Sequence, residues 1–225
     1  MEKISPVVLA LGAGHIEHLI RNADELLCQY RTDIGSFYLD YQPITPANKI
    51  APDDIAVTLL INSQAGWKAF HSLQEHADEI DLASLPQKPL EHTSQIERRQ
   101  IAALIAKMAQ FPGFAASLTT KLLHKKRPDL IPILDNQAIF GAYMNPDWPR
   151  KKARTDSIKD ESLICSALDW IAFDISRLEN MAAWGDLLAI EPARSRIELF
   201  DSVWWMYFRS LQPVFLRKDI NMEKS

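Results

Sequence analysis

Three residues near the middle of the chain have side chains and spacing suited to chemistry. Asp135 follows the apolar stretch 130–134 and precedes a predicted short helix over residues 136–143, so its carboxylate is expected at a helix start. Ser117 lies 18 residues before Asp135, and Lys121 follows Ser117 by one helical turn on the same face. The Lys121 ammonium could therefore reach toward Asp135. A fixed carboxylate can stabilise growing positive charge and orient water.

Each of these residues also has a purely structural interpretation. Aspartate is a preferred N-cap, so Asp135 could serve only to cap the helix that follows it. Ser117 could be an ordinary residue of a first helical turn. Lys121 could form a structural ion pair or be solvated. Both interpretations stay open on the sequence alone.

A tight turn precedes the three candidate residues. It lies between a predicted helix over residues 93–110 and a second one over 116–124. A hairpin that turns on glycine can point backbone N–H groups outward beside a helix N-terminus, where a phosphate can bind. The residues expected to anchor a phosphate are Pro112, Gly113, Phe114 and Ala115. The basic residues expected to hold a nucleic-acid backbone nearby are Lys125, Lys126 and Arg127.

Positive charge is concentrated in this part of an acidic protein. The formal net charge of the chain is −4, whereas residues 121–154 contain eight basic and three acidic residues. Such segregation suits a local phosphate-binding face, because lysine and arginine displace counterions from nucleic acids. The alternative is that two solvated loops happen to be basic.

The turn and the Asp135 segment resemble the helix-hairpin-helix DNA glycosylase superfamily. Its motif is a hairpin of the form L-P-G-hydrophobic-G, a helix, and an apolar segment that ends in a catalytic Asp. Residues 111–115 stand at the hairpin, and Pro132-Ile133-Leu134-Asp135 stands at the Asp segment. The resemblance implies that Asp135 is catalytic and that Ser117 occupies the position of the lysine nucleophile of bifunctional members. It implies a monofunctional enzyme, similar to the adenine mismatch glycosylases, with no lyase step.

The sequence departs from that superfamily at two points. Ala115 replaces the second hairpin glycine, which restricts the backbone where a phosphate would approach. With only two cysteines, the chain lacks the iron–sulfur ligands of many members. Over most of residues 50–209, the chain looks closer to a family of uncharacterised bacterial proteins. The resembling segments include 53–60, 121–132 and 200–206, and this likeness supplies no function.

Composition favours an all-α fold. The 225 residues are 47% apolar and contain only seven glycines, and apolar positions recur with helical spacing along the chain. We expect one compact helical domain over residues 1–216, with the hairpin element at 96–143, and a flexible tail at 217–225. The apolar run 7–13 is interpreted as part of the fold rather than as a signal peptide.

Other features exclude several classes of protein. No segment reaches 18 uninterrupted apolar residues, so no membrane span is expected. Cys28 and Cys165 suit a reducing, cytoplasmic setting, and no cofactor is expected. His15 and His18 share a helical face but have no further ligand nearby, so no metal site is expected.

Three functions remain open on the sequence. The first is a monofunctional DNA base-excision enzyme that flips a base from double-stranded DNA into a cleft beside Asp135. The second is a DNA-binding relative that has lost the chemistry. The third is a non-catalytic helical scaffold or protein-interaction module, because fold does not imply function.

Overall fold

Every regular element in the described part of the chain is a helix. The computed structural model describes residues 22–61, 65–145, 157–179 and 182–222, and no strand occurs among them, which confirms the all-α prediction. The α-helices are α2 (Ala23–Tyr30), α3 (Ser36–Asp40), α4 (Val57–Leu60), α5 (Trp67–His76), α6 (Gln95–Ala109), α7 (Ala116–Lys126), α8 (Glu161–Leu178), α9 (Ala182–Ile190) and α10 (Arg196–Met222). Shorter or wider turns of helix are η2 (Arg31–Gly35), η3 (Pro52–Ala56), η4 (Ala77–Glu79), η5 (Leu90–His92) and η6 (Asn136–Tyr143).

Local sequence signals set the boundaries of α6. Ser94 and Glu97 form a reciprocal capping box, in which the Ser94 hydroxyl accepts from the Glu97 N–H and the Glu97 carboxylate accepts from the Ser94 N–H at 2.7 Å. Buried residues such as Ile101 and Ile105 recur along one face, which packs against α8. Helix α6 therefore begins and ends close to where its sequence predicts.

The turn between α6 and α7 depends on one glycine. Gly113 has φ of +86°, a conformation that costs little only without a Cβ. A Cβ on Gly113 would also lie 2.7 Å from the Ala69 nitrogen of α5. The turn is thus held against α5, with the Ser72 hydroxyl donating to the Pro112 carbonyl at 2.8 Å.

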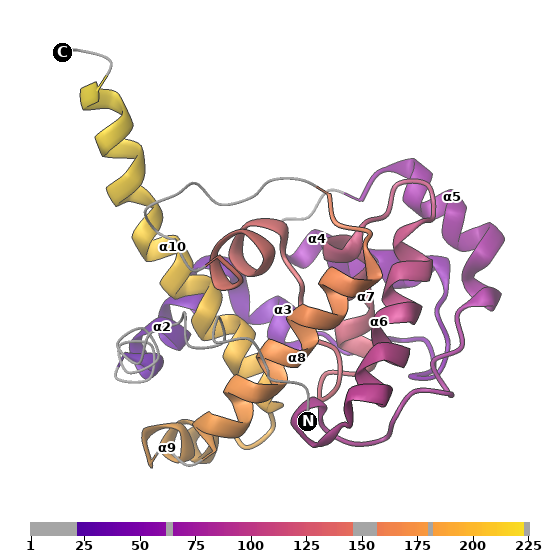
Figure 1. Ribbon diagram of the computed structural model, residues 1–225, viewed down its shortest axis with the longest axis horizontal. Helices are drawn as coiled ribbons and strands as arrows, with labels where there is room; N and C mark the ends of the chain where they lie inside the picture. Colours follow the sequence, from indigo (N-terminus) through magenta and orange to yellow (C-terminus); the bar gives the residue numbers. More distant parts are fainter. Residues whose placement is uncertain (1–21, 62–64, 146–156, 180–181, 223–225) are drawn as a thin grey trace.

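The longest helix in the described part of the chain, α10, packs against both α2 and η6. Its first half is buried against α2 and η6, and Trp204 and Phe200 pack edge-to-face on Tyr143. Its C-terminal half extends beyond the rest of the fold (Figure 1). Among the described residues, no helix is both long and apolar enough to cross a membrane.

Some sequence predictions concern residues that the structure does not describe, and others differ from what it shows. The apolar run 7–13, the two histidines of the first predicted helix and the basic run 150–154 lie outside the described residues. Helix α10 continues through residues 217–222, where the sequence predicts a tail. The segment over 136–143 is helical as expected, but it forms a wide π-type helix.

Candidate functional site

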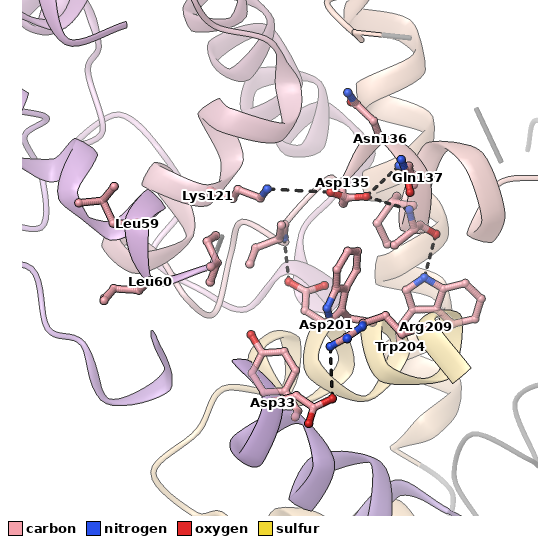
Figure 2. Close-up of a pocket in the computed structure, with 16 residues that line it drawn as sticks. Asp33, Leu59, Leu60, Lys121, Asp135, Asn136, Gln137, Asp201, Trp204 and Arg209 are labelled. Carbon is pink, nitrogen blue, oxygen red and sulfur yellow. Dashed lines mark hydrogen bonds and ion pairs between the residues drawn. The ribbon is translucent and has the colours of Figure 1, made fainter. Parts of the chain in front are cut away.

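A cavity of about 720 Å³ opens between α7, η6 and α10, a volume in the usual range of small-molecule sites. Elements from both ends of the sequence form its walls, and Figure 2 shows their side chains. The lining residues are Tyr30, Asp33, Leu59, Leu60, Ile61, Lys121, Ile133, Asp135, Asn136, Gln137, Ala138, Ile139, Asp201, Trp204, Trp205 and Arg209.

Asp135 lies at the start of η6 and on the cavity wall. Its Oδ1 accepts the N–H groups of Gln137 and Ala138 at 2.8 and 2.9 Å, which makes it the N-cap. Its Oδ2 lies 3.9 Å from the Lys121 Nζ, and the two side chains are 19% and 13% exposed. The predicted arrangement, a partly exposed Asp135 at a helix start with Lys121 on the same cleft, is confirmed. Capping and a position for chemistry are thus compatible.

Lys121 projects from α7 into a partly desolvated position. Burial lowers the pKa of its ammonium, and the nearby Asp135 carboxylate acts in the opposite direction. Ion pairs at such sites are screened less than surface pairs. The Lys121–Asp135 pair therefore places two opposite charges at one end of the cavity.

Ser117 does not join this pair. It is partly buried one turn before Lys121, and its carbonyl accepts from the Thr120 hydroxyl at 3.3 Å. Ser117 is not among the described residues that line the cavity. The structure brings together Asp135 and Lys121 but leaves Ser117 outside.

The turn at residues 112–115 is partly committed to other contacts. Pro112 and Gly113 are exposed and Phe114 is buried. The Phe114 N–H donates to the Phe111 carbonyl at 2.9 Å, and the first N–H of α7, that of Ala116, donates to the Ile158 carbonyl at 2.8 Å. A backbone carbonyl therefore already occupies one of the N-terminal N–H groups that an anion would use.

The prediction that Lys125 and Lys126 form an exposed basic face at the end of α7 is wrong. Lys125 Nζ pairs with Glu198 Oε1 at 2.7 Å, and Lys126 Nζ pairs with Asp54 Oδ1 at 2.8 Å, with all four side chains buried. An ammonium enclosed in this way cannot contact a phosphate on the surface. The charges instead hold α7 to α10 and to η3.

Arg127 is also used within the protein. It is partly buried and donates to the Gln87 side chain at 2.6 Å and to the Leu82 carbonyl at 2.5 Å. Burial lowers the pKa of its guanidinium. Arg127 thus fastens the end of α7 to the segment that precedes α6.

Residues of α10 supply a wall of the cavity that the sequence did not reveal. Trp204 is buried, and its Nε1–H donates to the Ala138 carbonyl at 2.9 Å. Trp205 is only partly buried and offers an aromatic surface to the cavity. Arg209 pairs with Asp33 at 3.4 Å. The only sequence signal for this wall was the apolar periodicity of the last helix.

A second cluster of potential ligand atoms lies outside the cavity. Donor atoms of Glu91, His92 and Glu179 lie within 4.8 Å of one another. The Arg196 guanidinium, however, pairs with both Glu91, at 2.9 Å, and Glu179. A protein cation therefore already pairs with both carboxylates, and the cluster does not indicate a metal centre.

Comparison with known sequences and structures gives a family but no activity. No curated protein and no solved structure matches the chain. Residues 23–208 match the model of a family of unknown function, DUF6308. This range covers most of the chain and includes every residue that lines the cavity except Arg209. The chain therefore belongs to the DUF6308 family.

Proposed function

We propose that the cavity cleaves an N-glycosidic bond between a nucleobase and its sugar, with Asp135 as the catalytic carboxylate. The observation that carries this proposal is the geometry of Asp135. Its Oδ1 is fixed by two backbone N–H groups, while its Oδ2 lies beside Lys121 at the cavity. A carboxylate that cannot rotate is preorganised to stabilise charge without reorienting during the reaction.

The chemistry follows from the charge that develops in the sugar. As the C–N bond breaks, its electron pair leaves with the base and the sugar acquires oxocarbenium character. The Asp135 carboxylate stabilises that positive charge and orients a water molecule, whose oxygen bonds to the anomeric carbon. The proton lost by the water balances the one that the departing base takes up. The partly buried ring of Trp205, which lines the cavity, supports stacking of the base.

The reaction proposed is hydrolytic and has no lyase step. An imine intermediate needs an uncharged amine as the nucleophile, and the position that the superfamily resemblance assigns to it is Ser117. Lys121 lies in the cavity; burial lowers the pKa of its ammonium, while its pairing with Asp135 opposes this shift. Its ammonium is a charge that holds the carboxylate in place.

The carrier of the base is either DNA, as the superfamily resemblance implies, or a free nucleoside. A duplex needs exposed cations for its phosphates. Lys125 and Lys126 do not supply them, since both are buried in ion pairs. The test must therefore include both kinds of substrate.

The experiment compares the full chain with Asp135→Asn. Duplexes carrying a panel of damaged bases are incubated and then treated with alkali to reveal abasic sites, and free nucleosides are assayed in parallel by chromatography of the released base. Asparagine caps a helix as well as aspartate does, so the variant should fold normally. It lacks the negative charge, and base release should fall by at least about a hundredfold. Equal activity of the two proteins would refute the catalytic role.

A non-catalytic binding module is the second candidate. It is favoured by the fact that the cap bonds and the Lys121 pair already account for both Asp135 oxygens. In that case a ligand binds equally to the wild-type chain and to Asp135→Asn, and neither protein releases a base.

A further inference from the structure

Asp201 is a buried acid on the wall of the cavity. Its Oδ2 accepts the Ile133 N–H at 2.8 Å. Its Oδ1 is buried and has no hydrogen-bond partner among the described residues. An unpaired buried oxygen costs free energy, so such atoms are few in folded proteins and are often functional. Asp201 lies on the wall of the cavity, between its two ion pairs (Figure 2).

The groups around Asp201 do not neutralise it as a carboxylate. The His124 Nδ1 is 4.0 Å from Oδ2, but it is directed at the Ile131 carbonyl at 2.6 Å. Burial lowers the pKa of His124 to about 4, so at neutral pH the ring carries no charge. Glu198, one turn earlier on α10, is an acid that adds repulsion.

The other described neighbours offer Asp201 no uncommitted cation. Tyr30 on α2 and Tyr38 on α3 are buried phenols whose pKa values are raised by burial. Lys125 is committed to Glu198. As a result, burial first and Glu198 second raise the pKa of Asp201 well above its ordinary value, although the Ile133 N–H opposes this.

In a protonated Asp201, the oxygen that carries the proton is defined. Because Oδ2 accepts the Ile133 N–H, the proton resides on Oδ1, for which the described residues supply no partner. This O–H group is buried in the side chain of a cavity-lining residue, and no acceptor in the described part of the chain satisfies it. A ligand atom with a lone pair would complete it.

The charges that line the cavity balance once Asp201 is neutral. Lys121 pairs with Asp135 at one end, and Arg209 pairs with Asp33 at the other (Figure 2). Among the described lining residues, these are the remaining charged groups. The site therefore favours a ligand without net charge, since a charged one would lose hydration without gaining a free counter-ion.

We propose that Asp201 is the specificity-determining residue of this cavity, and that its Oδ1–H donates a hydrogen bond to a keto oxygen or ring nitrogen of a neutral nucleobase or nucleoside. The choice of a nucleobase rests on the proposed function; the donor itself rests on the geometry of Asp201. Such a site rejects analogues without an acceptor, because the buried O–H would stay unpaired.

The test uses inosine, a neutral nucleoside with a keto oxygen, as the probe. Binding to the full chain is measured by calorimetry and by tryptophan fluorescence, for the wild type, Asp201→Asn and Asp201→Ala. Asparagine copies the protonated acid, because its oxygen can accept from the Ile133 N–H and its NH₂ group replaces the O–H. A melting curve for each variant verifies folding.

Infrared spectroscopy gives an independent reading of the proton. The wild type should show the carbonyl band of a protonated carboxyl at pH 7 that is missing from Asp201→Asn. The matched control is Asp33→Asn, since Asp33 is half exposed and paired with Arg209. This control should leave the band unchanged.

Two results are expected together. Asp201→Asn binds inosine within about threefold of the wild type, whereas Asp201→Ala loses about tenfold, the worth of one neutral hydrogen bond. A missing infrared band, an Asp201→Asn variant that loses as much as Asp201→Ala, or a wild type that does not bind inosine would each overturn the proposal.

Base release separates this inference from the proposed function. If inosine binds as expected but the wild type releases no hypoxanthine and no base from the duplex panel, the catalytic proposal fails and the role of Asp201 stands. If bases are released but Asp201→Asn behaves like Asp201→Ala, the proposed role of Asp201 fails and the catalytic proposal stands.

Discussion

Replacing Lys126 by methionine tests whether the end of α7 is a surface or part of the interior. Methionine keeps the length and the apolar stem of the side chain but removes the charge. In the native protein, Lys126 Nζ lies 2.8 Å from Asp54 Oδ1, and the two side chains are 1% and 4% exposed. The ammonium also donates to the Thr45 carbonyl at 3.2 Å. The variant leaves the Asp54 carboxylate buried without its cation.

The expected loss in the free energy of unfolding is large because the ion pair is buried. The distance between the two charges is not the deciding factor. Removing one partner of a buried pair destabilises a protein by about 3–5 kcal/mol. With a urea m-value of about 2–3 kcal/mol/M, this moves the unfolding midpoint by about 1–2.5 M. Reversing both Lys125 and Lys126 to glutamate would place new acids beside Glu198 and Asp54, and we expect that variant not to fold.

The assay is urea unfolding followed by far-UV circular dichroism at pH 7. The control is Lys88→Met, which breaks an ion pair of similar length, 3.0 Å to Glu97, at an exposed position. It should hardly move the midpoint, because exposed pairs contribute little. If Lys126→Met shifts the midpoint no more than Lys88→Met does, Lys126 is solvated, and the predicted basic face regains its support.

Two further changes test the turn and a buried acid. Gly113→Ala should lower stability by about 2 kcal/mol or more, because of its positive φ and the contact with Ala69. Gly185→Ala has no neighbour within 4 Å and should raise the helix stability by up to about 1 kcal/mol; equal melting temperatures for the two variants would contradict this. Burial raises the pKa of Asp174 to about 6, although the hydrogen bond from Tyr143 opposes this shift. The folded protein therefore holds a proton that the unfolded chain loses near pH 4, so stability should fall by roughly 2–3 kcal/mol between pH 4 and 7. Asp174→Asn should flatten this melting profile, and an unchanged slope would refute the assignment.

Much of the local structure was predictable from the sequence. Apolar spacing placed α6, the capping box placed its start, and the Pro-Gly pair placed the turn before α7. The position of Asp135 at a helix start also followed from the sequence. These features depend on residues within about one or two turns of each other, so backbone hydrogen bonding and side-chain periodicity determine them before any tertiary contact forms.

The environment of each charge was decided only by the tertiary structure. Lys125 and Lys126 are adjacent and basic, a pattern typical of a solvated loop, but their partners Glu198 and Asp54 lie more than 70 residues away in either direction. Asp201 stands in a helix whose pattern predicts core packing. Its burial beside the Ile133 N–H, with an Oδ1 that has no partner among the described residues, follows from the packing of α10 on the 130–134 segment. Charge type and helical period are local properties of the sequence. Burial and pairing depend on which distant helices pack together, and these determine which side chains can meet a ligand.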